Sequence, residues 1–176
     1  NATDVSFSSL AWRETSNELL GKLIDHMKTQ KYYNRIFGLR ITAGQTYEFM
    51  NVGTGADYLP DYSPVALTRF KEWAKEKYQT IDRLQAAWKD KDITFDTIAF
   101  PTLAERMSGK NTKTVYDITN DAWKIDYNKF VGEESGNALL VWAKTAKEKT
   151  NRTRIVGAYY GYLWAFGSYD GITKYH

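Results

Sequence analysis

A short apolar stretch decides the fold of this chain: Arg35-Ile36-Phe37-Gly38-Leu39-Arg40-Ile41-Thr42. It follows a polar linker, is rich in residues that favour strands, and ends at Ala43-Gly44, so it predicts a buried strand over residues 35–42. A second stretch of the same kind is Arg154-Ile155-Val156-Gly157-Ala158-Tyr159-Tyr160. Helical patterns precede and separate the two stretches. Strands that alternate with helices and are apolar throughout are typical of a parallel α/β architecture.

Capping residues mark two of the helices between the predicted strands. Ser63 is placed to cap a helix whose first position is Pro64, where the fixed φ of proline suits a helix and its missing N–H costs nothing. Thr80 is placed to cap a shorter helix that ends at Trp88. We therefore predict a pair of helices directly after the long glycine-containing loop of residues 44–62.

Two longer helices are predicted from apolar residues at helical spacing. One covers residues 12–30, and the other begins at Thr119 or Asn120 and continues to about Lys149. Residues 92–118 have no regular pattern, and Glu133-Glu134 should lie on a helix surface. The side chains that we expect to be buried are Leu19, Leu20, Leu23, Ile24 and Met27; Val65, Leu67, Phe70, Trp73, Ala74 and Tyr78; Ile81, Leu84 and Ala87; Phe95, Ile98, Phe100 and Pro101; and Leu139, Leu140, Trp142, Ala143 and Ala146.

The composition excludes several classes of function. The chain has 176 residues, a net charge of +3 and interleaved acidic and basic residues, so nothing predicts nucleic-acid binding. No apolar stretch approaches the ~18 residues of a membrane span. With no cysteine and only two histidines, we expect neither disulfides nor a metal site, and no cofactor. The compartment is not fixed, although a secreted or periplasmic protein is slightly favoured over a cytoplasmic one.

The aromatic content is unusual, because Phe, Trp and Tyr make up 15% of the residues. A heavily aromatic core would account for it. A sugar-binding site would also account for it, since flat rings stack on the apolar faces of pyranose rings. The composition alone does not separate these two interpretations.

The first strand leads into a loop that carries a candidate catalytic carboxylate. In a β/α barrel the active site lies at the C-terminal ends of the strands, and here that end continues as Thr42-Ala43-Gly44-Gln45-Thr46-Tyr47-Glu48-Phe49. Glu48 lies between two aromatic residues, which would disfavour its charged form, raise its pKa and suit a general acid. The alternative is a solvated loop glutamate.

The second strand also ends in residues suited to sugar binding. Tyr160, Tyr162 and Trp164 cluster there and either build a sugar subsite or pack beneath the rim of a barrel. At the first strand end, Tyr47 and Phe49 would line the same site. Two further side chains there, Arg40 and Gln45, could bond to a sugar hydroxyl.

One long segment resembles a known enzyme family. It runs from Ser63-Pro64 through Phe70-Lys71-Glu72-Trp73-Ala74-Lys75-Glu76-Lys77-Tyr78 to Thr80-Ile81-Asp82-Arg83-Leu84-Gln85-Ala86-Ala87-Trp88. This pattern is similar to the stretch after the fourth barrel strand in the bacterial-type glycoside hydrolase family 42 β-galactosidases and their clan A relatives. The continuation to Phe100-Pro101 and the opening Ser6-Phe7-Ser8-Ser9 are further matches.

The resemblance implies a fold and a reaction. Members of the family have a (β/α)8 TIM barrel and hydrolyse glycosides with retention of configuration, so residues 1–176 would be part of a catalytic barrel covering about strands four and five with their helices. The family's acid/base glutamate ends strand four, which corresponds to Glu48. Typical members carry Asn before that glutamate, whereas this chain has Tyr47. Either residues 44–48 are a variant of the motif, or Glu48 is not catalytic.

The resemblance also places the second carboxylate outside this chain. A retaining mechanism needs two carboxylates ~5–5.5 Å apart, and the family's nucleophile ends strand seven. The only acid in residues 160–176 is Asp170, in a Ser-Tyr-Asp-Gly turn pattern. We therefore expect a fragment that is inactive alone. Because two strands would leave sheet edges open, we expect further barrel segments or a homo-oligomer as its partner.

Three functions remain open at this point. The first is a retaining glycoside hydrolase of β-galactosidase type, with a carbohydrate as substrate. The second is a carbohydrate-binding α/β module without catalysis, which the Tyr47 substitution and the missing nucleophile would permit. The third is a structural α/β unit whose aromatic residues only pack.

Overall fold

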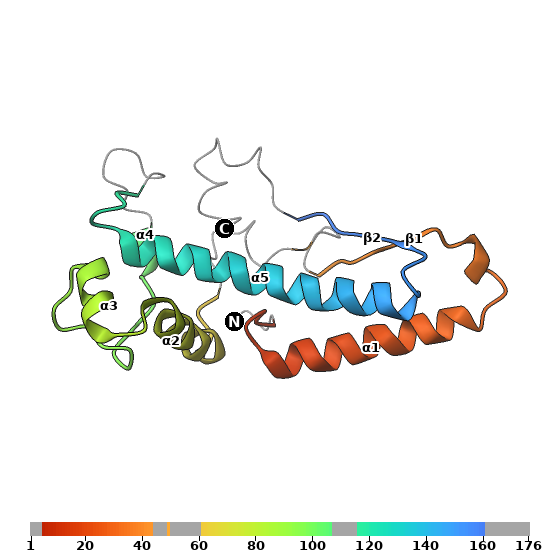
Figure 1. Ribbon diagram of the computed structural model, residues 1–176, viewed down its shortest axis with the longest axis horizontal. Helices are drawn as coiled ribbons and strands as arrows, with labels where there is room; N and C mark the ends of the chain where they lie inside the picture. Colours follow the sequence, from red (N-terminus) through yellow and green to blue (C-terminus); the bar gives the residue numbers. More distant parts are fainter. Residues whose placement is uncertain (1–4, 44–48, 50–60, 107–115, 161–176) are drawn as a thin grey trace. The chain divides into compact units, whose positions relative to one another are not determined.

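The computed structural model describes residues 5–43, 49, 61–106 and 116–160 (Figure 1). The chain forms two compact units. The first combines Asn1–Val52 with Glu134–Tyr160, and the second combines Gly53–Glu133 with Gly161–His176. The long helix α5 (Ala122–Lys149) contributes its first part to the second unit and its remainder to the first.

A parallel pair of strands organises the first unit. Strand β1 (Gly38–Arg40) pairs with β2 (Ile155–Gly157), with Leu39 opposite Val156. The Ile155 amide donates to the carbonyl of Phe37 at 3.1 Å, and the Ile41 amide donates to the carbonyl of Gly157 at 2.8 Å. The predicted parallel α/β pairing is confirmed, although each regular strand is shorter than the sequence stretch suggested.

The prediction that these strands are fully buried is wrong. Phe37 is 81% exposed and Ile155 is 65% exposed, whereas Leu39 and Val156 pack against the core of the unit. Successive side chains of a strand point to opposite faces, and in the described residues only one face of this pair is covered. A continuous apolar stretch therefore alternates between core and surface.

Helix α1 (Leu10–Lys28) packs on the first unit's core. Ser9 caps it by accepting a hydrogen bond from the Trp12 amide at 3.2 Å. The core of this unit consists of Phe7, Ile24, Ile41, Phe49, Ala138, Trp142 and Ala146. On α1 the buried face is marked by Arg13, Gly21 and Ile24.

Several leucines that we expected in the core are at the surface. Leu19, Leu23 and Leu140 are 60%, 55% and 66% exposed. Gly21 lies on the buried face of α1 that approaches α5, where a Cβ would lie 3.3 Å from Cε of Lys149. Leu19 and Leu23 lie at other angles on the helix and are excluded from that contact.

The second unit is helical in its described part. Helix α2 (Pro64–Tyr78) begins as predicted, because Ser63 Oγ accepts from the Ala66 amide at 3.1 Å and Pro64 occupies the first turn. Helix α3 (Ile81–Trp88) is capped by Thr80 as predicted, with the Arg83 amide donating to its hydroxyl at 3.4 Å. Within the stretch that had no regular pattern, the short helix α4 (Leu103–Arg106) forms.

Aromatic rings fill the core of the second unit. Phe70 is completely buried and lies 5.1 Å from Phe130 and 5.7 Å from Tyr127 between ring centroids. The predicted anchors Ile98 and Pro101 are buried, and Phe95 and Phe100 pack beside them. The remaining core side chains are Ala66, Ala74, Leu84, Trp88 and Val131. Val65 and Ile81, both expected to be buried, are 45% and 41% exposed.

A buried carboxylate ties three helices of this unit together. Asp126 of α5 is 3% exposed and accepts hydrogen bonds from Lys77 and Tyr78 of α2 and, at 2.9 Å, from Nε1 of Trp88 of α3. Burial, reinforced by the Asp126 charge, raises the pKa of Tyr78 far above its usual range, so its hydroxyl remains a donor. A buried charge is tolerated because its oxygens are supplied with donors.

We predict that Asp126→Ala lowers the free energy of unfolding by about 3 kcal/mol, because it leaves the buried Trp88 donor and the half-buried Tyr78 hydroxyl without an acceptor. Asp126→Asn should cost less, since its amide oxygen still accepts one bond. The measurement is urea unfolding followed by far-UV circular dichroism. The control is Lys129→Ala, which removes an exposed 3.7 Å pair with Glu133 and should have little effect. Equal stability of Asp126→Ala and the control would contradict the assignment.

Candidate functional site

The candidate site lies at the C-terminal edge of the β1–β2 pair. Beyond Ile41 the chain forms a parallel bridge between Ala43 and Phe49. The Phe49 amide donates to the carbonyl of Tyr159 at 2.8 Å, so the backbone returns to the sheet there. Ligand sites of parallel α/β folds form outside the C-terminal ends of their strands.

Phe49 is the buried anchor of this edge. Its side chain is 1% exposed, and its ring stacks on Phe7 with centroids 4.9 Å apart and an interplanar angle of 14°. Trp142 and Tyr160 meet it edge-on at 5.4 Å and 6.3 Å. The ring thus belongs to the core beneath the edge, and its expected part in lining a sugar site remains a prediction.

Two tyrosines and an arginine are accessible at the same edge. Tyr159 is 58% exposed and Tyr160 is 45% exposed. The guanidinium of Arg40, from the end of β1, lies 5.2 Å from the centroid of the Tyr159 ring, a cation–π contact. Partial burial raises the pKa of Tyr160 above its usual value, so its phenol is a protonated hydrogen-bond donor at neutral pH. Flat rings beside such donors suit a polyhydroxylated ligand.

The other predicted site residues lie outside the described part of the chain. These are the candidate acid/base Glu48 together with Gln45, Tyr47, Tyr162 and Trp164. Among the residues that the structure describes, no group of three or more His, Asp or Glu side chains is arranged to hold a metal ion. In the same residues no helix is both long enough and apolar enough to cross a membrane.

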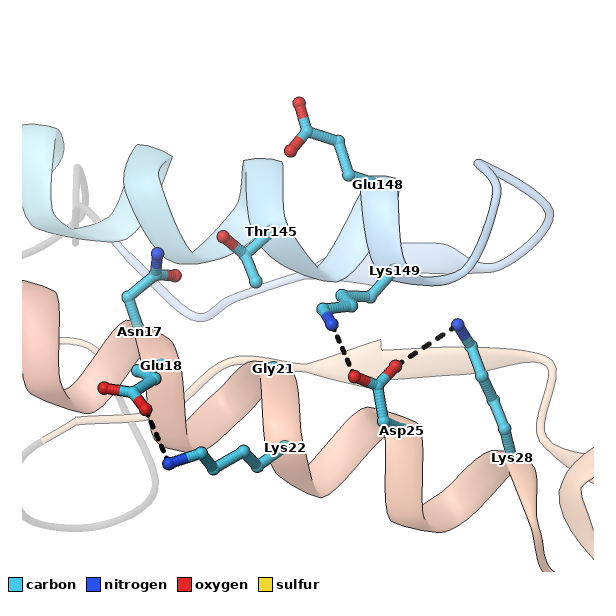
Figure 2. A pocket seen from close by; sticks show the side chains of 9 residues that line it. All are labelled: Asn17, Glu18, Gly21, Lys22, Asp25, Lys28, Thr145, Glu148 and Lys149. Atoms are coloured by element: carbon cyan, nitrogen blue, oxygen red, sulfur yellow. Dashed lines mark hydrogen bonds and ion pairs between the residues drawn. The ribbon is translucent and has the colours of Figure 1, made fainter.

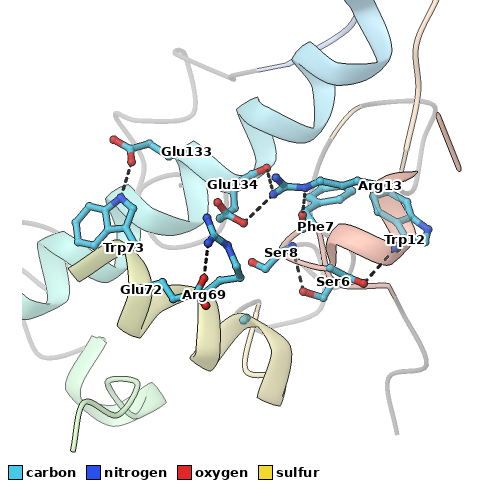
Figure 3. Close-up of polar contacts among 12 residues, drawn as sticks. Ser6, Phe7, Ser8, Trp12, Arg13, Arg69, Glu72, Trp73, Glu133 and Glu134 are labelled. Carbon is cyan, nitrogen blue, oxygen red and sulfur yellow. Dashed lines mark hydrogen bonds and ion pairs between the residues drawn. The ribbon is translucent and has the colours of Figure 1, made fainter. Parts of the chain in front are cut away.

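Sequence reasoning missed a buried ion pair behind this edge. The prediction that Glu134 lies on a helix surface is wrong, because its side chain is 3% exposed. The same prediction is confirmed for Glu133, which is exposed and accepts a hydrogen bond from Nε1 of Trp73 at 2.6 Å. Arg13 Nη2 donates to Oε2 of Glu134 at 2.8 Å and to its carbonyl at 2.9 Å (Figure 3). The sequence offered one signal for this pair, which is that Arg13 has the helical spacing of the buried residues Gly21 and Ile24 on α1. Because Arg13 is charged, it was not recognised as part of a buried face.

A hollow in the first unit, between α1 and α5, is lined mostly by charged and polar residues. Three ion pairs lie among its lining residues (Figure 2). Lys22 pairs with Glu18 and Lys28 pairs with Asp25 within α1, and Lys149 of α5 pairs with Asp25 across the two helices. A hydrogen bond from Lys149 is the main cause that holds the pKa of Asp25 below its usual value. Since no aromatic ring lines this hollow, it lacks the platform that a sugar ring requires, and the edge of the sheet is the better candidate.

Comparison with models of known protein families identifies the family of this chain. A family model described as Beta-galactosidase, that of glycoside hydrolase family 42, matches residues 4–173. The match spans both strands, all the helices described above and the candidate edge. No curated protein matches the chain.

We predict that Phe49→Ala destabilises the first unit by about 3–5 kcal/mol, because it removes a fully buried ring from a stack and leaves a cavity. Phe49→Leu should cost clearly less. Unfolding in urea, followed by the fluorescence of the tryptophans, gives both values. As a matched control, Phe37→Ala removes a ring that is 81% exposed and should leave stability nearly unchanged. A Phe49→Ala protein as stable as Phe37→Ala would show that Phe49 is not an anchor.

Proposed function

The chain belongs to glycoside hydrolase family 42, the β-galactosidase family, and we propose that it carries the acid/base carboxylate, Glu48, of a retaining enzyme that acts on β-galactoside-like carbohydrates. The family has a TIM barrel, and the parallel β1–β2 pair with its helices is consistent with part of one. Glycoside hydrolysis of β-galactosidase type is thus the function that the family supports. The catalytic role of Glu48 is a proposal that goes beyond the family assignment.

The anchoring of Phe49 is the observation that carries this assignment. Its amide bonds to Tyr159 and its ring is locked in the core at the C-terminal edge of the sheet. Glu48 precedes Phe49 in the sequence, and consecutive Cα atoms are ~3.8 Å apart. A carboxylate bonded to so firmly anchored a residue is kept within reach of the strand ends, where ligands of parallel α/β folds bind.

The chemistry assigns Glu48 two successive tasks. It protonates the oxygen of the leaving group as the glycosidic bond breaks, and it then removes a proton from the water that hydrolyses the glycosyl-enzyme. The nucleophile would lie ~5–5.5 Å from it. No described residue at the edge is acidic, so we assign the nucleophile to a later strand, as the resemblance to the family implies.

Aromatic residues at the strand ends would bind the sugar. Tyr160, which is 45% exposed, is the described member of this group, and Arg40, which lies over the ring of the adjacent Tyr159, would supply donors. Tyr47, Tyr162 and Trp164 complete the proposed lining, with Gln45 as a further donor or acceptor. Rings at this edge would stack on the apolar face of a pyranose while the polar groups bind its hydroxyls.

A second candidate is carbohydrate binding without hydrolysis. It is favoured by the exposed tyrosines at the edge, which suffice for stacking, and by Tyr47, which occupies the position of the asparagine that typically precedes the family's catalytic glutamate. In this case an oligosaccharide would change the tryptophan fluorescence of the wild-type protein, and no galactoside would be turned over.

We predict that Glu48→Gln in the full-length enzyme, which includes the nucleophile, lowers kcat/KM for an unactivated alkyl β-galactoside by about 10²–10⁴-fold, the usual contribution of a general acid. A substrate with a good leaving group, such as 4-nitrophenyl β-galactoside, should lose less in the bond-breaking step, because its leaving group needs no proton. The control is Glu133→Gln, an exposed helix glutamate, which should leave the rate unchanged. A near wild-type rate for Glu48→Gln would reject the assignment.

A further inference from the structure

Two charged side chains are buried in the first unit, on helices α1 and α5. Arg13 of α1 is 8% exposed and Glu134 of α5 is 3% exposed. Another ion pair, between Lys149 and Asp25, also joins α1 to α5 but lies near the surface, with side chains 40% and 48% exposed. A buried ion pair often contributes no more stability than apolar side chains of the same volume. Its value must therefore lie in the geometry that it imposes.

The guanidinium of Arg13 connects two separate parts of the first unit. Its Nη2 donates to Oε2 and to the carbonyl of Glu134, while its Nε donates to the carbonyl of Phe7 (Figure 3). A guanidinium carries donors in a rigid planar fork, whereas a lysine ammonium is a single point. Only an arginine at residue 13 can therefore hold Glu134 and Phe7 in a fixed relation at the same time.

Phe7 passes this constraint to the edge of the sheet. Its ring is 3% exposed and stacks on Phe49 at 4.9 Å. Phe49 in turn bonds through its amide to Tyr159. The contacts run without a break from Glu134 through Arg13, Phe7 and Phe49 to the C-terminal edge, so a shift of the Phe7 backbone would tilt the ring on which Phe49 rests.

We propose that the Arg13–Glu134 pair is a positioning device that fixes Phe49 at the C-terminal edge, next in sequence to Glu48. This inference rests on the proposed function of Glu48. Neither Arg13 nor Glu134 contacts the substrate. Because a misplacement of about 1 Å can cost a factor of ~10² in rate, a loosened Phe49 should impair proton donation to the leaving group more than it impairs folding.

The test compares Arg13→Lys and Glu134→Gln with Lys149→Met in the intact protein. Arg13→Lys retains the charge but not the fork, and Glu134→Gln retains the acceptors but not the charge. The control, Lys149→Met, removes the other α1–α5 pair without reaching Phe7. For Arg13→Lys we expect kcat/KM to fall at least ~10-fold for the alkyl β-galactoside and under ~3-fold for 4-nitrophenyl β-galactoside. For Lys149→Met the ratio between the two substrates should be unchanged.

Amide hydrogen exchange supplies a readout that is independent of activity. Arg13→Lys should accelerate exchange of the Phe49 amide, while the amide of Ala138, in the core part of α5, keeps its wild-type protection. An equal loss on both substrates, or unchanged exchange at Phe49 in both Arg13→Lys and Glu134→Gln, overturns the proposal. If the wild-type protein hydrolyses neither substrate, the proposed function fails, and exchange at Phe49 alone decides whether the pair positions that residue.

Discussion

The parallel pairing of β1 with β2 is the constraint on which the rest of the structure depends. Parallel neighbours cannot be joined by a tight turn, so the chain must leave one end of the sheet and return to the other. Here the connection takes up residues 41–154, which include the whole described part of the second unit. Parallel pairing also places both strand ends, with Phe49 and Tyr159, at the same edge.

Local signals in the sequence predicted local features well. Ser63 and Thr80 cap their helices because a side-chain oxygen needs only the amides of the next turn. Burial was harder to predict, because it depends on which face meets a partner. Gly21 lets α1 approach α5 on a face other than that of Leu19 and Leu23. Glu134 was misjudged for the same reason, since its partner lies 121 residues away in Arg13.

The segment that resembles the family reflects packing more than catalysis. Three aromatic residues of that segment, Phe70, Tyr78 and Trp88, pack together in the structure. Tyr78 and Trp88 also donate hydrogen bonds to Asp126. A sequence pattern of this kind identifies a fold, whereas activity depends on residues placed at the strand ends. The resemblance and the proposed acid/base residue therefore rest on different parts of the chain, and support for one is not support for the other.

Buried aromatic rings explain much of the aromatic content, and this narrows the search for a sugar site. Phe7, Phe49 and Trp142 pack in the first unit, and Phe70, Tyr127 and Phe130 pack in the second. A ring in the core cannot stack on a sugar. Among the described residues at the sheet edge, Tyr159 and Tyr160 combine exposure with a place beside the strand ends. Of the described rings at this edge, these two are open to a ligand, while the buried rings beneath them hold the edge in place.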